Sequence, residues 1–374
     1  MREDNRPRDE TLCPGAKSLV GTTTPLVAQE VASFAMADFL ERLPKCELHV
    51  HLEGTLEVGM ARALAARHGV SGVTATRPSE YHGLAEFLGD YYAALGGLRT
   101  EADYYDLARA YLDVARRQGV VYAEMFFDPQ AHTSRGVSFG DVVTGVHRAQ
   151  EDARARGGPD SELVMCFLRD ETVASAEDTL EASLPYKARG WIIGVGLDSD
   201  ERGNPPAKFA EVFAAARGAG YRVTMHCDPR QDDAVAHLWQ CLDVIGVERL
   251  DHGIDCLADS SLTEEIARRR LGLTLCPLSN LHLYGDLMAA TIVELIGRGV
   301  LVTINSDDPA YFGGYIADNF AALRDAARLS RHDMAQLAKN GFEASWITAE
   351  RRGSYLKLVD EHLAAAGHAR GGGR

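Results

Sequence analysis

The sequence lacks the marks of several protein classes. Its seven cysteines are scattered, odd in number and without a Cys-x-x-Cys pair, so neither a disulfide framework nor a zinc knuckle is expected, and a reducing compartment is the default. No apolar run approaches the roughly 18 residues of a transmembrane helix. The charged N-terminus has no apolar core of a secretory signal. We therefore expect a cytoplasmic protein without a membrane partner.

Positive charge is also scarce. The chain carries 39 Lys and Arg residues against 54 Asp and Glu residues, a formal net charge of −15. A basic surface for nucleic acid is therefore not expected, and a neutral or cationic small molecule fits better as a partner. The composition is that of an ordinary globular protein. A chain of 374 residues is long for one domain, although an α/β barrel reaches this size as a single unit.

The two ends differ from the rest of the chain. Residues 1–35 mix charge, Pro, Gly and Thr without periodicity, and residues 367–374 are rich in glycine. We interpret both as flexible tails that flank one domain over residues 36–366, with a short helix at Ala35–Leu43.

Between the tails, strand-like apolar runs alternate with longer segments of helical spacing, such as Tyr104–Arg117 and Phe139–Arg156. Eight strand–helix units in succession indicate a parallel sheet closed into a (β/α)₈ TIM barrel. The eight runs are Cys46–Leu52, Val120–Phe127, Leu163–Leu168, Ile192–Leu197, Tyr221–His226, Val247–His252, Leu271–Cys276 and Leu301–Asn305.

Nearly every run ends in polar residues, and in such a barrel the carboxyl ends of the strands build the active site. The first strand contains His49 and His51, whose i, i+2 spacing places both imidazoles on one face. The fifth strand ends at His226, and the eighth is followed by an Asp-Asp pair. Each feature alone is more often incidental. Together, three imidazoles and a carboxylate at strand ends predict a zinc site that leaves a position for water.

The sixth strand ends at His252, which we expect beside the metal, where it can take or hold a proton. Zinc lowers the pKa of bound water to about 7, so a metal-bound hydroxide would be the nucleophile at neutral pH. The residues thus predict a hydrolytic enzyme.

From about Leu43 to Thr348 the sequence resembles the adenosine/adenine deaminase family of the metal-dependent amidohydrolases. Several of the shared motifs are similar to the adenine-type branch in particular. The segments that carry the resemblance are HVHLEGT, LRTEADYYDLA, EMFFDPQAHT, GVGLDSDERGNPP, ERLDHGID, CPLSNLHL and TINSDDPAYFGGY.

The resemblance implies roles for individual residues. His252 would be the catalytic histidine, Asp308 would meet a ring nitrogen of the base, and the backbone at Ser199 would contact the ring. Glu53 occupies the place of an aspartate that holds the sugar in nucleoside-acting relatives, so its longer side chain implies a nucleobase-sized pocket. The implied ligands of one Zn²⁺ per chain are His49, His51, His226 and Asp307. Barrels of this class often pair, so a homodimer is a further expectation.

One motif departs from the family. Where relatives have His-Ala-Gly-Glu, this chain has His226-Cys227-Asp228-Pro229, so the proton-donating Glu is replaced by Pro229. Loss of a positioned acid costs about 10²- to 10⁴-fold in rate. Asp228 could act as the catalytic acid from one position earlier, the substrate could need no such proton, or a neighbour such as Arg230, Gln231 or Asp232 could reshape the pocket. We favour the last two, because Pro229 fixes the local backbone.

Three functional hypotheses follow. The first is a zinc-dependent aminohydrolase that deaminates adenine or a related amino-substituted nitrogen heterocycle. The second is a zinc hydrolase that cleaves a different C–N or C–X bond of a small cyclic substrate. The third is a catalytically inactive barrel that binds zinc and senses a ligand.

Residues near the motifs also have ordinary structural interpretations. Cys227 is expected to pack against the barrel wall, and His82, His132 and His282 are expected at the surface. The segment from Tyr311 to Tyr315 is interpreted as a mobile aromatic stretch near the site.

Overall fold

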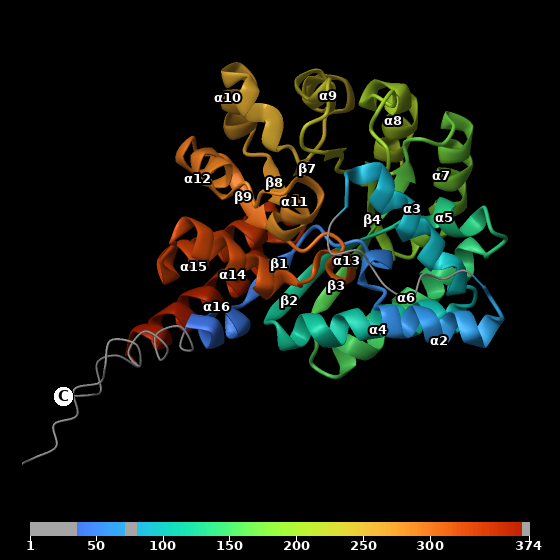
Figure 1. Ribbon diagram of the computed structural model, residues 1–374, viewed down its shortest axis with the longest axis horizontal. Helices are drawn as coiled ribbons and strands as arrows, with labels where there is room; N and C mark the ends of the chain where they lie inside the picture. Colours follow the sequence, from blue (N-terminus) through green and yellow to red (C-terminus); the bar gives the residue numbers. More distant parts are fainter. Residues whose placement is uncertain (1–35, 72–80, 369–374) are drawn as a thin grey trace, which may run out of the picture.

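The computed structural model describes residues 36–71 and 81–368. Short parallel strands occupy the centre, and helices surround them (Figure 1). The strands are β1 (Lys45–Glu47), β2 (Val120–Phe127), β3 (Asp160–Leu168), β4 (Ile192–Asp198), β5 (Arg222–Val223), β6 (His226–Cys227), β7 (Arg249–His252), β8 (Gly272–Leu275) and β9 (Leu301–Ile304).

The helices follow the strands in the alternation that the sequence predicts. The α-helices of the first half are α2 (Val58–His68), α3 (Leu84–Ala94), α4 (Glu101–Arg117), α5 (Pro129–Thr133), α6 (Phe139–Ala155), α7 (Val173–Ala188) and α8 (Ala210–Gly218). Those of the second half are α9 (Ala234–Gln240), α10 (Ser260–Arg269), α11 (Pro277–Tyr284), α12 (Ala289–Gly297), α13 (Pro309–Phe312), α14 (Ile316–Ala327), α15 (Arg331–Ala344) and α16 (Ala349–His368). Short single turns are η1 (Glu53–Thr55), η2 (Leu95–Gly97), η3 (Pro206–Phe209), η4 (Cys241–Ile245) and η5 (Ile254–Ala258).

The parallel strands close into a barrel. One run of pairing joins β1 to β5 in order, and a second joins β6 to β9. The seam between β9 and β1 is closed by backbone bonds from the His51 amide to the Asp307 carbonyl and from the Asp307 amide to the His49 carbonyl, each 3.0 Å. The predicted (β/α)₈ fold is therefore confirmed, and its closure brings the first and last strand ends together.

Several predicted strands differ from the observed ones by a few residues at their ends, and two differ more. The first ends at Glu47, although His51 still forms an isolated bridge to Phe126. The fifth is split into β5 and β6, because its first half pairs with β4 and its second half pairs with β7. The regular strand pairing is interrupted next to His49, His51 and His226. These polar residues therefore lie outside or at the edge of the regular strands, at the mouth of the barrel.

Helices α4 and α6 show how the outer layer forms. Helix α4 begins with a capping box between Thr100 and Asp103 and buries Tyr104, Leu107 and their neighbours. It packs closely on α6, where a Cβ atom at Gly145 would lie 2.3 Å from the carbonyl oxygen of Glu101. Only glycine permits this approach, which lets α6 pack directly against α4.

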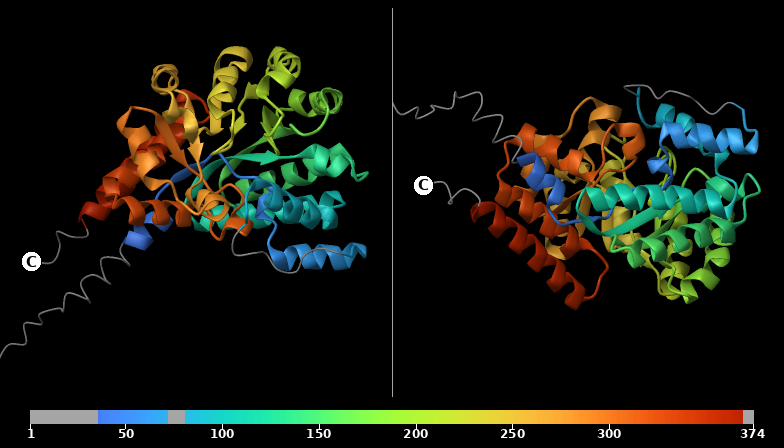
Figure 2. Two further views of the ribbon diagram at one scale, coloured as in Figure 1. Left: turned by 45° about the horizontal axis from the view of Figure 1, so that its top comes forward. Right: turned by 90° about the horizontal axis from the view of Figure 1, so that it is seen from below.

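The ends of the described chain lie side by side. Residues 36–42 are helical and pack beside α16 (Figure 2), where His362 donates a hydrogen bond of 3.0 Å to the Phe39 carbonyl. The predicted N-terminal tail, residues 1–35, lies outside the described residues. So does the predicted C-terminal tail, apart from the last two residues of α16.

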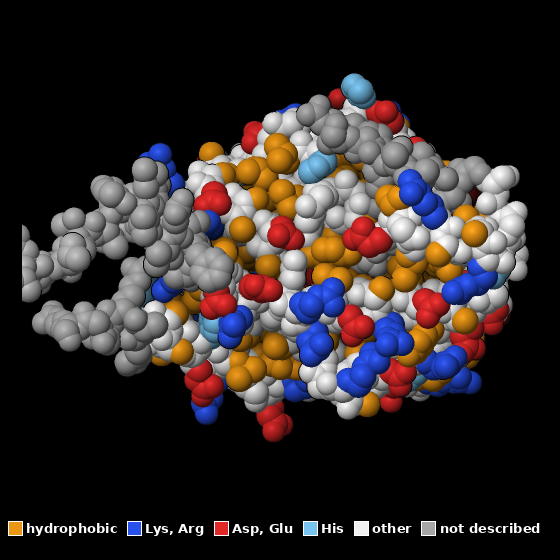
Figure 3. Space-filling model, turned by 60° about the horizontal axis from the view of Figure 1, so that its bottom comes forward, with side chains coloured by type: hydrophobic (Ala, Val, Ile, Leu, Met, Phe, Trp, Pro, Cys, Tyr) orange, Lys and Arg blue, Asp and Glu red, His pale blue; other side chains and the backbone are white. Residues whose placement is uncertain are grey.

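The surface mixes its charges. On the face in Figure 3, acidic and basic side chains alternate with hydrophobic ones. Among the helices that the structure describes, none is both long and apolar enough to cross a membrane. The cysteines within the described ranges are all buried and unpaired.

Candidate active site

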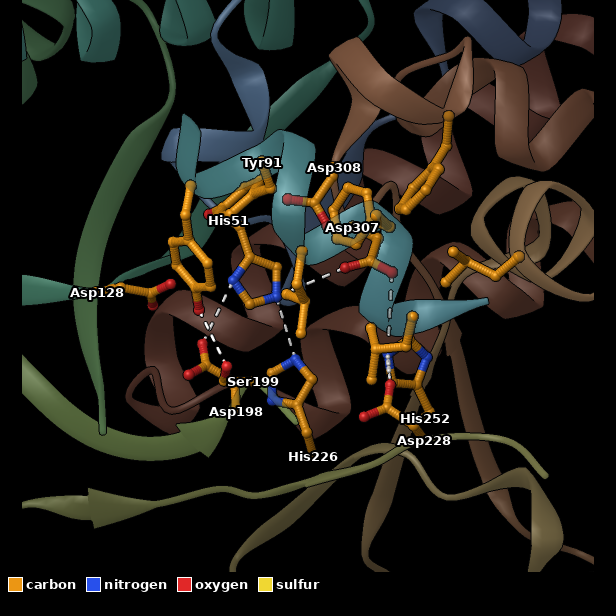
Figure 4. Close-up of a pocket in the computed structure, with 16 residues that line it drawn as sticks. His51, Tyr91, Asp128, Asp198, Ser199, His226, Asp228, His252, Asp307 and Asp308 are labelled. Atoms are coloured by element: carbon orange, nitrogen blue, oxygen red, sulfur yellow. Dashed lines mark hydrogen bonds and ion pairs between the residues drawn. The ribbon is translucent and has the colours of Figure 1, made fainter. Parts of the chain in front are cut away.

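The polar strand ends meet in one cavity at the carboxyl ends of the barrel strands (Figure 4). It is lined by side chains from most of the strands and by aromatic residues of α3 and α13. Seven of the nine residues predicted for the site line it, namely His51, Ser199, His226, Asp228, His252, Asp307 and Asp308.

The four predicted metal ligands converge at its floor. The Nε2 atom of His226 lies 3.1 Å from Nε2 of both His49 and His51. The Oδ1 atom of Asp307 lies 3.2 Å from Nε2 of His49 and 3.5 Å from Nε2 of His51. Ligands at about 2.0–2.1 Å around a tetrahedral ion lie about 3.3–3.4 Å apart. These four distances lie close to that value, as expected for one small cation held by three nitrogens and one oxygen.

The electrostatics of these groups suit a cation. Burial lowers the pKa of His51, and burial together with the neighbouring imidazoles lowers the pKa of His226 well below its ordinary value. Burial alone would raise the pKa of Asp307, but the imidazole of His49 and its neighbours hold it well below its ordinary range. Neutral imidazoles and an ionised carboxylate are the protonation states that a metal requires of its ligands.

A second layer of side chains orients the imidazoles. Nδ1 of His49 lies 2.8 Å from Oγ1 of Thr274, whose hydroxyl donates to Asp251 at 2.9 Å. Nδ1 of His226 lies 3.7 Å from Oδ2 of the same aspartate, which also accepts from Thr224 at 2.6 Å. The contact with Thr274 fixes the tautomer and the ring orientation of His49, whereas Nδ1 of His226 makes no hydrogen bond and only faces the carboxylate of Asp251.

His252 lies beside the four predicted metal ligands without being one of them. Its Nε2 atom is 3.5 Å from Oδ1 of Asp228 and 3.8 Å from Oδ2 of Asp307. Both His252 and Asp307 have a positive φ, 57° and 63°. Non-glycine residues held in this region cost free energy and cluster at functional sites.

The divergent segment places an acid in the cavity. Asp228 is 7% exposed and lines the cavity, and burial raises the pKa of its carboxyl to about 7. Arg230 is exposed, and its side chain donates to the carbonyl of Tyr284 at 3.1 Å. Asp232 is exposed as well. Arg230, Gln231 and Asp232 are absent from the cavity wall, which leaves Asp228 as the acid of this segment that faces the site.

Asp308 also faces the cavity, and its Oδ1 atom has no hydrogen-bond partner. Burial, followed by the charge of Asp307, raises its pKa well above the ordinary value. A Cβ atom at Gly54 would lie 2.0 Å from that oxygen. Glycine at position 54 is therefore required for Asp308 to lie where it does.

Glu53 lies behind the cavity wall. It is 1% exposed, and its Oε1 atom accepts from the Asp128 amide at 3.1 Å and pairs with Nε2 of His132 at 2.8 Å. It does not line the cavity, so in this structure it supports Asp128 rather than reaching the space for a ligand. The surface position expected for His132 is wrong, because this contact buries the ring completely. His82, by contrast, is exposed.

Two carboxylates of the wall were not predicted as site residues. Asp128 follows β2 and Asp198 ends β4, and both line the cavity. Burial raises the pKa of Asp198 to about 7, and neither of its carboxylate oxygens makes a hydrogen bond. The strand-end rule that identified the histidines would also have found them. Next to Asp198, Ser199 has a φ of 73° and accepts a 3.1 Å bond from the hydroxyl of Tyr92.

Aromatic side chains cover the cavity from above. Phe87 of α3 packs against Phe312 of α13 with ring centroids 4.9 Å apart, and Tyr91 packs against Tyr311 at 5.6 Å. The aromatic segment predicted near the site therefore contributes Phe312 to the wall. The rings restrict access of water and present flat apolar surfaces, which suit a planar ring.

A (β/α)₈ barrel with three histidines and an aspartate gathered at its mouth defines the class of metal-dependent barrel hydrolases. The Adenosine deaminase family model matches residues 44–362. The chain belongs to this family, as the sequence motifs indicated.

The relatives agree in fold and length. The adenine deaminase of Hahella chejuensis is 44% identical over 335 residues, which cover 88% of this chain and 99% of that protein. The adenine deaminase of Streptomyces coelicolor is 47% identical, covering 87% and 97%. The crystal structure of adenine deaminase from Arthrobacter aurescens is 38% identical with a TM-score of 0.81, covering 86% and 99%. The chain is thus a hydrolase acting on C–N bonds, and its family implies a metal cofactor.

Proposed function

We propose that the protein is a zinc-dependent aminohydrolase that releases ammonia from adenine or a related amino-substituted nitrogen heterocycle. The observation that carries this proposal is the cluster of His49, His51, His226 and Asp307 beside His252 in a covered cavity. The adenine deaminases among its relatives point to the same substrate class.

The donor set supports zinc as the metal. Three imidazole nitrogens and one carboxylate oxygen form a borderline set that zinc accepts in tetrahedral geometry. When bound, zinc lowers the pKa of water to about 7 and thus supplies a strong nucleophile at neutral pH.

The remaining residues would bind the base and handle protons. Asp308 and the backbone of Ser199 hold the heterocycle against the aromatic wall. His252 orients the attacking water and takes its proton. Asp228 gives a proton to the ring nitrogen beside the attacked carbon. In the family motif this is the role of the Glu that Pro229 replaces here. The side chain of Asp228 supports this because it lines the cavity 3.5 Å from His252.

Ammonia release tests the proposal. Zinc-loaded protein would be assayed with adenine first and then with amino-purines, pterins and amidines, with His252→Ala as the matched inactive control. We expect turnover of at least one amino-substituted heterocycle and its loss in the control. Ligand binding without ammonia from any compound would overturn the proposal in favour of a sensing barrel. Cytoplasmic location and assembly into a homodimer stay predictions.

A further inference from the structure

Buried charged side chains that do not line the cavity form hydrogen bonds to the backbone of the three-residue segment from His226 to Asp228. We propose that Glu201, together with Arg169 and His237, is a positioning residue that fixes the backbone of this segment and so aims the Asp228 side chain into the cavity. The inference rests on the proposed function, because it assigns to Glu201 an effect on the acid of that reaction.

Two side chains hold the two ends of the segment. The Oε2 atom of Glu201 accepts a hydrogen bond of 2.9 Å from the amide of Asp228. The Nη1 atom of Arg169 donates a bond of 3.0 Å to the carbonyl of His226. The two side chains form an ion pair of 3.4 Å with each other. The segment is therefore fixed at both ends by one charged pair.

The pair is completed by a third residue. Nδ1 of His237, in α9, lies 2.6 Å from Oε1 of Glu201, and its N–H donates a hydrogen bond to that carboxylate oxygen. Arg169 and Glu201 have no exposed surface, and His237 is 6% exposed. A buried charge is tolerated only when it is paired and hydrogen-bonded. The carboxylate is thus anchored on both oxygens, one toward α9 and one toward the segment.

The network acts through the backbone, since Arg169, Glu201 and His237 do not line the cavity. Directly after Asp228 the chain has Pro229, which has no N–H to donate. Arg230 then turns with a φ of 62° and is exposed. The Asp228 amide is the last backbone donor before this turn, so its bond to Glu201 sets where the carboxyl points.

A hydrogen-exchange measurement tests the geometry without any substrate. The side chain of Glu201→Gln has one acceptor oxygen instead of two, so it cannot accept from both the Asp228 amide and His237. We therefore expect the Asp228 amide to exchange about tenfold faster. Asp200→Asn, on the same loop and paired only with Arg202, is the control and should leave exchange unchanged. Unchanged exchange in Glu201→Gln would overturn the inference.

A pair of substitutions at His237 keeps the inference testable if the Glu201→Gln variant fails to fold. An asparagine can place its side-chain N–H where Nδ1 of the imidazole lies, whereas leucine keeps the bulk and removes the donor. We expect His237→Leu to lower kcat by about 10- to 100-fold with little change in KM, and His237→Asn to restore most of the rate. Equal losses in both variants would contradict a role for the donor.

A double-mutant cycle separates positioning from general stability. If His237 and Glu201 act through Asp228, His237→Leu should cost less than about twofold when added to Asp228→Asn. Full additivity would overturn the inference. Absence of ammonia release by the native enzyme would instead contradict the proposed function, and the exchange measurement would still decide the geometry.

Discussion

Oδ1 of Asp228 lies 3.5 Å from Nε2 of His252, at the edge of the predicted metal ligands. The pair brings a carboxyl and an imidazole to the same wall of the cavity from the ends of neighbouring strands, β6 and β7. The residue that follows, Pro229, has no side-chain proton to give. The acid that we propose, Asp228, therefore lies one position earlier than the Glu of the family motif.

Replacement of Asp228 tests this assignment. Asp228→Asn keeps the shape of the side chain but removes its acidic proton, so we expect kcat to fall by about 10²- to 10⁴-fold. Ammonia release at saturating substrate would measure the effect. Asp232→Asn is the matched control, because Asp232 is exposed on the same loop. Equal activity of the Asp228→Asn variant and the native enzyme would exclude Asp228 as the acid.

Replacement of Asp307 tests the metal site. We expect Asp307→Asn to retain much less than one zinc per chain after dialysis, because the site loses its charged ligand. Where free zinc exceeds its Kd about 100-fold, binding stabilises the native protein by about 2.7 kcal/mol, so a chelator should lower the Tm. Metal analysis and thermal unfolding measure both effects. Asp325→Asn, at the surface, should match the native protein, and undiminished zinc in Asp307→Asn would contradict the assignment.

Much of this site follows from alternation and strand order. The spacing of His49 and His51, and the place of His226 and Asp307 at later strand ends, predicted a cluster because parallel strands share one carboxyl edge. The contacts that bury His132 on Glu53 join residues 79 positions apart. A local sequence pattern cannot predict a contact between residues so far apart in the chain, and the ring was therefore expected at the surface.

The covering of the cavity was harder to predict for the same reason. Phe87 and Tyr91 lie on α3, away from any strand end, and reach the site only through packing on α13. Glu201 was part of a recognised motif, but its role depends on Arg169 and on α9, which the chain brings together only on folding. Conversely, Asp128 and Asp198 were predictable from strand order alone.

Glycine at position 54 provides a steric test. A methyl group there would lie 2.0 Å from Oδ1 of Asp308, so Gly54→Ala must displace that carboxyl. We expect kcat/KM to fall by about 10- to 100-fold, measured by ammonia release. Gly59→Ala is the control, because nothing lies within 4 Å of a methyl group there and alanine favours the helix by about 0.5–1 kcal/mol. Retention of full kcat/KM by Gly54→Ala would show that the position of Asp308 is unimportant.

A buried ion pair beneath the site allows a test of stability. Arg249 pairs with Glu124, and neither side chain has any exposed surface. The guanidinium also stacks on the ring of Trp346 at 4.2 Å, and the Trp346 amide donates to Glu124 at 2.7 Å. Glu124→Gln leaves the charge of Arg249 buried with only the more distant carboxylate of Asp251, whose Oδ1 atom lies 3.8 Å from Nε of the guanidinium.

We therefore expect Glu124→Gln to lower the free energy of unfolding by about 3–5 kcal/mol, the usual cost of breaking a buried pair. Glu248 pairs with Arg222 at the surface, so Glu248→Gln should cost no more than about 1 kcal/mol. Equilibrium unfolding in urea, followed by tryptophan fluorescence, would compare the three proteins. Equal stability of the two variants would mean that water or a neighbouring acid replaces the charge of Glu124, and the barrel would then not depend on this pair.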